Sequence, residues 1–432
     1  MRYQKIDPQL FIHNRKNLLK ELKPNAVVVV NANDHMPTNA DGTFRFRQNS
    51  DLFYLSGVDQ EESTLLLCPD FPDEKFRQVL FLRETNEQIA LWEGHKLTKE
   101  EAREATGIQT VLWQTEFSRI FHTMMVMGNV EHVYLNTNDH YRAEVSVDSR
   151  DQRFIKWCQR KYPLHHYERL APILHRLRSV KSKGEIELMQ KACDITEMAF
   201  RRILKFVKPG VKEYEIEAEY AHEFLRNGSH GFAYEPIIAS GANSCVLHYI
   251  VNDQVCKEGD VLLLDVAAEY ANYNADLTRT IPVNGKFTER QRQVYNAVLR
   301  IQKAAMKMLK PGVVYFEYHK EIQKITEQEL INLKLIDQHD IKKQNPDKPL
   351  FLKYFSHGTS HMLGLDVHDV GNMYHKMVAG MVWTVEPGIY IREENLGVRI
   401  ENNVVITETG IIDLMKNIPA EPEEIENIMH SK

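Results

Sequence analysis

Long apolar runs are missing from the sequence, and their absence excludes a large class of proteins. No stretch of the 432 residues is apolar over the length needed to cross a bilayer, and the first residues lack the apolar segment of a secretory signal. We therefore expect no membrane partner and a cytoplasmic location. The hydrophobic fraction of 43% and the charged fraction of 26% are typical of a globular protein.

Cysteine is also scarce, and its distribution excludes two kinds of cross-link. The five cysteines are an odd number and contain no Cys-x-x-Cys pair, so we expect neither a disulfide framework nor a thiolate zinc site. Reduced, mostly buried thiols are expected at Cys68, Cys158, Cys193, Cys245 and Cys256.

An excess of basic residues and the common nucleotide and serine motifs are absent as well. The 54 Lys and Arg residues are dispersed among 60 Asp and Glu residues, which gives a net charge of −6 and no expected nucleic-acid partner. No glycine-rich phosphate loop or Gly-x-Ser-x-Gly elbow occurs. The pair His222-Glu223 begins like a zincin motif but lacks the second histidine, so we interpret it as part of a surface helix.

The length and the pattern along the chain predict two domains. Up to about residue 170, short β-rich runs alternate with helix-like segments such as 99–105, which indicates an α/β domain over residues 1–175. A capping box from Ser182 to Glu185 then begins a long amphipathic helix and a second domain over residues 176–432. The predicted strands of the first domain are 27–30, 64–67, 79–82 and 132–135.

The second domain contains an internal repeat. Lys-Pro-Gly-Val occurs at 208–211 and again at 310–313, and the run 259–265 aligns with 380–386. The Pro-Gly match alone is also explained by coincidence, since Pro-Gly is a common helix terminator. Asp265 nevertheless aligns with Glu386, and His248 aligns with His368. The repeat therefore predicts two similar halves, related by a pseudo-twofold axis, whose acids converge.

Asp265 lies inside an apolar strand, where an unpaired carboxylate is costly. A hairpin centred on residues 270–273 would place it opposite Asp276, and two adjacent like charges need a proton or a cation between them. The same arrangement recurs in strands 381–390 and 397–407, which carry Glu386 and Glu401. Four carboxylates can balance two divalent cations, and oxygen ligands favour Mn²⁺, Mg²⁺ or another hard ion.

Imidazole ligands are available in the segment HGTSHMLGLDVHDVG, which contains His357, His361 and His368 among glycines. A lone histidine is more often structural. Three of them within twelve residues, near an acid-bearing hairpin, indicate a functional cluster.

This combination resembles the pita-bread metallopeptidases, and among them the Xaa-Pro aminopeptidases. The resemblance is carried by HGTSHMLGLDVHDVG, TVEPGIYI and GVRIENNVVIT, and by the N-terminal motif RQNSDLFYLSG at 47–57, so that it spans nearly the whole chain. Met362 stands where the commoner pattern has a tryptophan. The fold it implies is an α/β creatinase-like N-terminal domain followed by an α+β pita-bread catalytic domain.

The resemblance implies a dinuclear centre, most readily with two Mn²⁺ ions, that presents a shared hydroxide to a peptide bond before proline. The implied metal ligands are Asp265, Asp276, His361, Glu386 and Glu401. Prolidase activity on Xaa-Pro dipeptides is the alternative within the enzyme class. A non-enzymatic pita-bread interaction protein is the alternative outside it.

Further roles also follow from the resemblance. Glu386 would take the proton of the water, while His248 and His368 would hold the substrate and stabilise the tetrahedral intermediate. His357 would lie in the substrate pocket. Tyr390 would supply a hydrogen bond and Arg399 would fix a carboxylate, although an ordinary strand tyrosine and a salt-bridged arginine fit the sequence equally well. The expected partners are Xaa-Pro peptides and further copies of the chain, in a homodimer or homotetramer.

Overall fold

The chain divides into two compact units in a computed structural model, which describes residues 2–144 and 146–431. One unit spans 4–178, and the other comprises 179–432 together with residues 1–3. The division falls close to the boundary that the sequence predicts at residue 175. Within the described residues, no helix is both long and apolar enough to span a membrane. All five cysteines are free and buried, as predicted.

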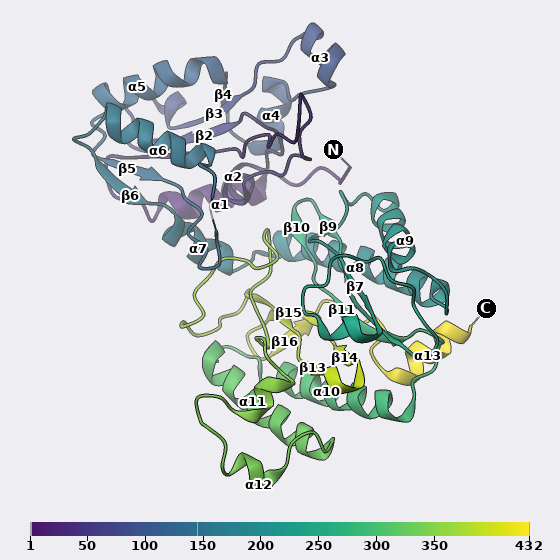
Figure 1. The fold of residues 1–432 in the computed structure, drawn as a ribbon. Helices are drawn as coiled ribbons and strands as arrows, with labels where there is room; N and C mark the ends of the chain where they lie inside the picture. The colour runs from purple at the N-terminus through teal and green to yellow at the C-terminus, as the bar shows by residue number, and fades with distance from the viewer. Residues whose placement is uncertain (1, 145, 432) are drawn as a thin grey trace. The chain divides into compact units, whose positions relative to one another are not determined.

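The first unit is built on a six-stranded mixed sheet with the strand order β4-β3-β2-β1-β5-β6 (Figure 1). Strands β1, β5 and β6 are parallel, while β2 is antiparallel to both β1 and β3. All four predicted strands are present. The strands are β1 (Ala26–Asn31), β2 (Thr64–Leu67), β3 (Gln78–Leu82), β4 (Thr110–Trp113), β5 (His132–Leu135) and β6 (His166–Arg169).

Helices cover the sheet, which explains why its central strands are apolar on both faces. Phe117 and Phe121 of α5 pack with Cys158 of α6 against Val27 and Phe81 of the sheet. The helices are α1 (Gln9–Leu19), α2 (Ser50–Ser56), α3 (Glu87–Glu93), α4 (Lys99–Thr106), α5 (Phe117–Met127), α6 (Arg150–Lys161) and α7 (Ala171–Ser179), with short 3₁₀ segments η1 (Glu74–Phe76) and η2 (Gln114–Glu116).

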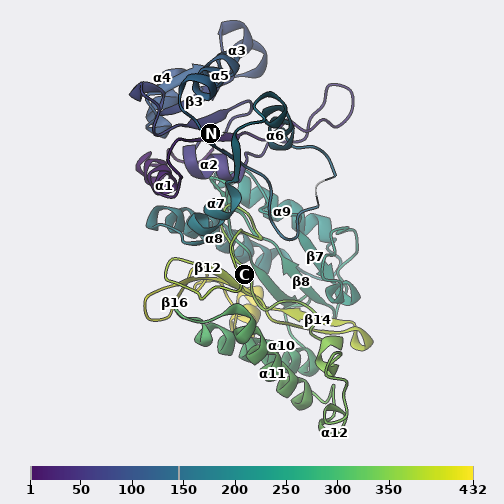
Figure 2. The same ribbon diagram turned by 90° about the vertical axis from the view of Figure 1, so that its left-hand side faces the viewer.

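The second unit contains the predicted repeat. Each Lys-Pro-Gly-Val segment joins a long helix to a second helix, and its glycine adopts a positive φ of 95° at Gly210 and 92° at Gly312. The two glycine N–H groups donate to equivalent carbonyls, those of Cys256 and Met377. In Figures 1 and 2 the helix pairs lie on two sides of the strands. The helices are α8 (Lys183–Phe206), α9 (Glu213–Arg226), α10 (Glu289–Met308), α11 (Tyr315–Asn332), α12 (Gln338–Ile341) and α13 (Pro422–His430).

The strands of this unit form short antiparallel sheets that carry the predicted acids. Their orders are β11-β8-β7, β10-β9, β12-β15-β16 and β13-β14. The strands are β7 (Ile237–Ser240), β8 (Val261–Asp265), β9 (Glu269–Tyr270), β10 (Tyr273–Asn274), β11 (Thr278–Pro282), β12 (Val382–Val385), β13 (Gly388–Ile391), β14 (Leu396–Arg399), β15 (Asn402–Ile406) and β16 (Ile411–Asp413), and the 3₁₀ segments are η3 (Gly241–Cys245), η4 (Leu350–Lys353) and η5 (Arg392–Glu394).

The first hairpin has a different register from the predicted one. Asp265 pairs with Thr278, and not with Asp276. The reason is the turn, which consists of Ala271 and Asn272 alone, with φ values of 53° and 66°. Such a two-residue turn with positive φ at both positions shifts the pairing by two residues relative to the prediction. Asp276 therefore stays on the same face of the hairpin as Asp265, but diagonal to it.

The second hairpin is interrupted where the sequence predicts continuous strands. The predicted strand 381–390 is divided into β12 and β13 at Glu386-Pro387, and the predicted strand 397–407 is divided into β14 and β15 at Ile400-Glu401. Val385 pairs with Asn402 on one side of the break, and Gly388 pairs with Arg399 on the other. The break follows from Pro387, which has no N–H group for the ladder.

Candidate metal centre

The four predicted acids lie at strand ends or strand breaks, where backbone groups leave the regular ladders. The N–H groups of the two glutamates bond outside their own hairpin, Glu386 to the carbonyl of Thr359 at 2.8 Å and Glu401 to that of Thr278 at 3.0 Å. The latter bond joins the second hairpin to the first. The backbone near Glu401 thus lies beside the backbone near Asp276, although the two acids are far apart in the sequence.

Asp276, His361 and Glu401 form the centre of the cluster. One ligand atom from each lies within 4.8 Å of the others, a spacing that can hold a metal ion. The Nε2 atom of His361 is 3.4 Å from Asp276 Oδ2 and 3.5 Å from Glu386 Oε1. All four side chains are largely buried. The structure therefore brings four of the five predicted ligands into one cluster.

Asp265, the fifth predicted ligand, is held at the side of this cluster by two donors. Tyr234 donates its hydroxyl to Asp265 Oδ1 at 2.5 Å, and Arg399 Nη2 donates to Asp265 Oδ2 at 2.7 Å. Arg399 also donates from Nε to the hydroxyl of Thr278, which in turn donates to Glu401 Oε2 at 2.7 Å. A continuous hydrogen-bonded path therefore links Asp265 to Glu401.

The electrostatics of the metal-free cluster are unfavourable for ionised carboxylates. Burial raises the pKa of Glu386 to about 7, and burial together with the neighbouring acids raises the pKa values of Asp265 and Glu401. Burial alone would lower the pKa of His361, but Asp276 and Glu386 raise it to about 9. The positive charges of His361 and Arg399 are thus too few to balance the four carboxylates.

The donor set fits divalent metal ions. Among the described residues, the cationic groups paired with the four carboxylates are Arg399 and His361, so the negative charge of the cluster exceeds its positive charge. Glu401 Oε1 is buried and has no hydrogen-bond partner in the described part of the chain. An uncompensated buried carboxylate oxygen is costly, and a cation removes this cost. Carboxylate oxygens with one imidazole suit a divalent metal ion.

Three further predicted residues, Arg399, Tyr390 and His357, form a hydrogen-bonded chain beside the acids. Arg399 Nη1 donates to the Tyr390 hydroxyl at 2.8 Å, and this oxygen is also 2.8 Å from His357 Nε2. Burial and the charge of Arg399 lower the pKa of His357 to about 3, so its ring is neutral. With Nδ1 donating to the carbonyl of Gly358, Nε2 accepts the proton of the Tyr390 hydroxyl.

The two histidines predicted to hold the substrate lie on different loops. The ring of His368 packs edge to face on that of His361, with 4.5 Å between the centroids. His248 is exposed in the segment after η3, close enough to His357 for its charge to contribute to the lowered pKa there. Leu247 and Tyr249, on either side of His248, pack against the core cluster that contains Tyr390.

Sequence reasoning missed several residues that support the cluster. Tyr234 bonds Asp265, and Thr384 donates to Glu386 Oε1 at 3.3 Å. Asn403 accepts from the N–H of Asp276 at 2.9 Å and donates to its carbonyl at 2.7 Å. Thr384 and Asn403 stand inside the motifs TVEPGIYI and GVRIENNVVIT, so their position next to ligands was an available signal. Tyr234 has no such signal, because it precedes Asp265 by a whole strand.

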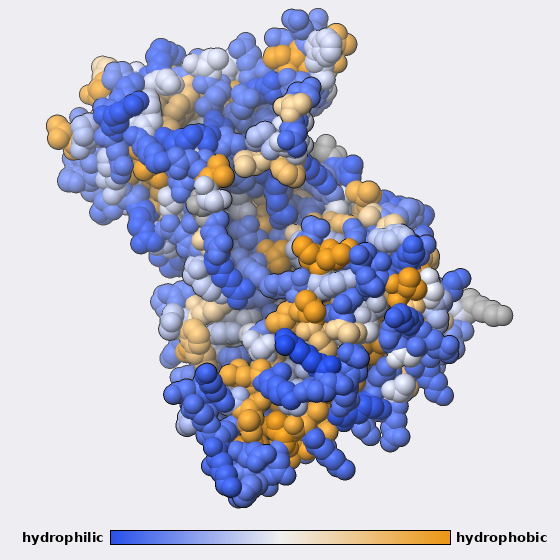
Figure 3. All heavy atoms as spheres, in the orientation of Figure 1, coloured by the Kyte–Doolittle hydropathy of each residue, from blue (hydrophilic) through white to orange (hydrophobic). Residues whose placement is uncertain are grey.

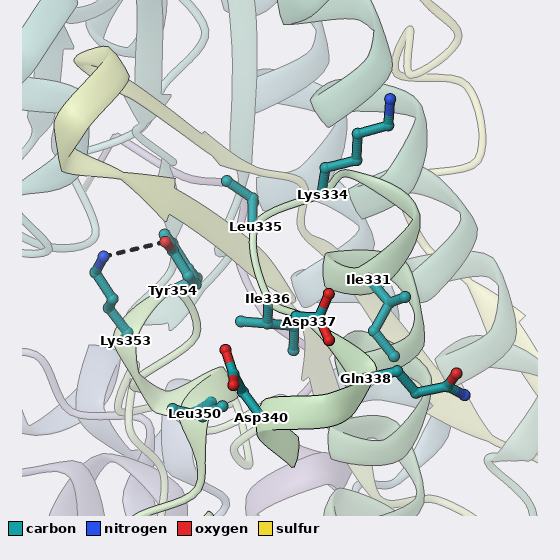
Figure 4. Close-up of a pocket in the computed structure, with 10 residues that line it drawn as sticks. All are labelled: Ile331, Lys334, Leu335, Ile336, Asp337, Gln338, Asp340, Leu350, Lys353 and Tyr354. Atoms are coloured by element: carbon teal, nitrogen blue, oxygen red, sulfur yellow. Dashed lines mark hydrogen bonds between the residues drawn. The ribbon is translucent and has the colours of Figure 1, made fainter. Parts of the chain in front are cut away.

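A separate pocket lies where α11 is followed by α12, and it contains none of the predicted residues. Hydrophobic side chains gather over these helices in Figure 3, and Figure 4 shows the residues that line the pocket. They are Ile331, Lys334, Leu335, Ile336, Asp337, Gln338, Asp340, Leu350, Lys353 and Tyr354. Its acids and lysines do not form a metal-binding group, so the acid cluster remains the candidate site.

Comparison with family models gives two matches that together span most of the chain. Residues 187–408 match the metallopeptidase family M24, and residues 11–134 match the aminopeptidase P N-terminal domain. The chain is 34% identical to the Xaa-Pro aminopeptidase of Escherichia coli, with 98% of each chain covered. It is 31% identical to the human Xaa-Pro aminopeptidase 3, over 93% of this chain and 80% of the human protein.

Solved structures give the same result. Zinc-substituted Escherichia coli aminopeptidase P in complex with product superposes with a TM-score of 0.87 at 32% identity, with 99% of both chains covered. Aminopeptidase PepP of Pseudomonas aeruginosa gives a TM-score of 0.88 at 30% identity, with 98% of both chains covered. The Escherichia coli enzyme with the inhibitor Pro-Leu gives 0.86 at 33% identity and 99% coverage of both.

Proposed function

The chain belongs to metallopeptidase family M24 and is a hydrolase of the aminopeptidase P type with a pita-bread catalytic domain, and we propose that it releases the N-terminal residue from peptides whose second residue is proline. The observation that carries this proposal is the buried cluster of Asp276, His361, Glu386 and Glu401, with Asp265 beside it, in a chain that is similar to an Xaa-Pro aminopeptidase over 98% of its length. Residues 1–175 are proposed as the N-terminal domain and 176–432 as the catalytic domain.

The proposed cofactor is a pair of divalent metal ions, with Mn²⁺ as the physiological ion. The residues that would hold them are Asp265, Asp276, His361, Glu386 and Glu401. When bound, such ions supply a Lewis acid for the peptide carbonyl and lower the pKa of a water molecule. The excess carboxylate charge supports this assignment, as does Glu401 Oε1, which has no hydrogen-bond partner among the residues that the structure describes.

Glu386 is the proposed general base. A carboxylate within hydrogen-bond reach of the attacking water can accept its proton, and the Glu386 carboxylate lies in the acid cluster, 3.5 Å from His361 Nε2. Its Oε atoms would receive the proton of the attacking water and then give it to the departing proline nitrogen. Thr384, which donates to Oε1, would orient the carboxylate.

Three histidines are proposed to bind the substrate, with support from Tyr390 and Arg399. His248 and His368 would donate to the substrate carbonyl oxygen as negative charge develops on it. His357 would lie beside the proline, kept neutral by burial. Tyr390, which receives a hydrogen bond from Arg399, would hold the His357 ring in position. Arg399 would in addition fix Asp265.

Substrate length separates this activity from prolidase activity. We expect the purified protein with Mn²⁺ to release arginine from Arg-Pro-Pro and to turn over Gly-Pro much more slowly, as measured by chromatography of the products. Turnover of the dipeptide alone would instead establish a prolidase. Absence of turnover of both peptides, together with absence of bound metal, would establish a non-enzymatic interaction protein.

A homodimer or homotetramer and a cytoplasmic location are further proposals that rest on the family resemblance and on the composition. Light scattering is expected to give a mass of two or four times the chain mass of 50.4 kDa. A monomer at micromolar concentration would contradict the proposed assembly. Fractionation of cells that express the protein tests its location.

A further inference from the structure

A fully buried ion pair lies next to the histidine loop and has no role in the chemistry described above. Lys181 Nζ is 3.0 Å from Asp369 Oδ2, and only 1% of either side chain is exposed. Burial of two charges is expensive, and the attraction between them offsets this cost only when their geometry is good. A buried pair is therefore weak as a source of stability, and a role in fixing a particular conformation explains its presence better.

Asp369 directly follows His368 and closes the loop that begins at His361. Its N–H donates to the carbonyl of Met362 at 2.9 Å, so the two ends of the loop are joined. Gly364 lies in close contact with the ion pair. A Cβ atom at this position would lie 2.2 Å from Asp369 Oδ2 and 2.9 Å from Lys181 Cε. The pair thus lies against a loop whose two ends carry the packed rings of His361 and His368.

The backbone at Lys181 is fixed by hydrogen bonds of Lys181 and of the residue that follows it. Its N–H donates to the carbonyl of Gly380 at 2.8 Å, just before β12, the strand that leads to Glu386. The next residue, Ser182, donates its N–H and its hydroxyl to Glu185 at the start of α8. The lysine side chain therefore extends to Asp369 from a fixed backbone.

We propose that Lys181 is a positioning residue, which fixes Asp369 through the buried ion pair and thereby orients His368 for substrate binding. The inference rests on the proposed function for the role of His368. His361 is held independently, since its N–H donates to Thr384 Oγ1 and its carbonyl accepts from the Thr384 N–H. Loss of the pair consequently displaces the histidine that holds the substrate while the metal ligand stays in place.

The test uses a double variant, because a single substitution such as K181M leaves an unpaired buried charge and destabilises the protein. K181M/D369L removes both charges and is expected to fold. We expect KM for Arg-Pro-Pro to rise. The value of kcat/KM should fall by about 10- to 100-fold. Bound metal, measured by elemental analysis, should be unchanged. Hydrogen exchange of the amides in residues 362–371 should be at least several-fold faster than in the parent.

The matched control is K183M/E187L, which removes an exposed pair on α8 whose side chains are 92% and 66% exposed. This variant should keep the parent kinetics and exchange rates. A folded K181M/D369L protein with the parent KM and the parent exchange rates would overturn the inference. Faster exchange in a protein whose parent shows no peptidase activity would instead show that the ion pair orders the loop, and would overturn both the proposed function and the role of His368 in substrate binding.

Discussion

The Glu401→Gln variant is expected to lose both bound metal and nearly all peptidase activity. Glu401 Oε1 is buried with no hydrogen-bond partner within the described residues, while Oε2 accepts from Thr278. An amide can keep the bond from Thr278 but supplies no charge to a cation. Because metal ions contribute several kcal/mol of transition-state stabilisation, we expect kcat/KM to fall on the order of 10³-fold. Metal content measured by elemental analysis of protein purified without chelator should fall in parallel.

The Glu408→Gln variant is the matched control for this experiment. Glu408 is an exposed acid that follows β15, the strand after Glu401, and its replacement changes the charge of the protein by the same amount. This variant should keep its metal and its activity. Asp276→Asn is expected to behave as Glu401→Gln does. Full activity in either ligand variant would contradict the assignment of these residues to the metal centre.

The metal-free protein is expected to lose stability as the pH rises from about 4.5 to 7. Glu386 has an ordinary pKa of 4.5 and a pKa of about 7 in the folded metal-free chain, so the folded state holds its proton more tightly than the unfolded state. Below pH 4.5 both states are protonated and this contribution is fully present. It is lost as the pH rises through the folded pKa, at a cost of about 3 kcal/mol in the free energy of unfolding.

Urea unfolding of chelator-treated wild type and Glu386→Gln between pH 5 and 8 measures this effect. Glutamine does not titrate, so the wild type should lose about 2.5 kcal/mol more than the variant over this range. Mn²⁺ should restore the stability of the wild type, by about 2.7 kcal/mol at a hundredfold excess over the dissociation constant. Equal pH profiles for the two proteins, or no effect of Mn²⁺, would contradict the account.

The sequence predicted the elements of the fold better than their pairing. Apolar runs such as 64–67 and 132–135 became the expected strands, because burial on both faces leaves a strong local signal. The register of the first hairpin depended instead on the left-handed conformation of Ala271, which the residue type does not indicate. The pairing of Asp265 with Thr278 was consequently missed by two residues.

The candidate site was predictable where its residues share a motif. His361 and His368 lie in one glycine-containing segment, and the strand repeat aligned Asp265 with Glu386. Tyr234 could not be found in this way, because its bond to Asp265 depends on the fold alone. The buried partnership of Lys181 with Asp369 has the same origin, since 188 positions separate the two residues.

Anomalous diffraction from crystals soaked in Mn²⁺ tests the central claim most directly. The account predicts two manganese peaks about 3.5–4 Å apart. They should be coordinated by the side chains of Asp265, Asp276, His361, Glu386 and Glu401. A single peak, peaks elsewhere in the chain, or a Mn²⁺ pair that Asp265 and Glu386 do not both contact would contradict it.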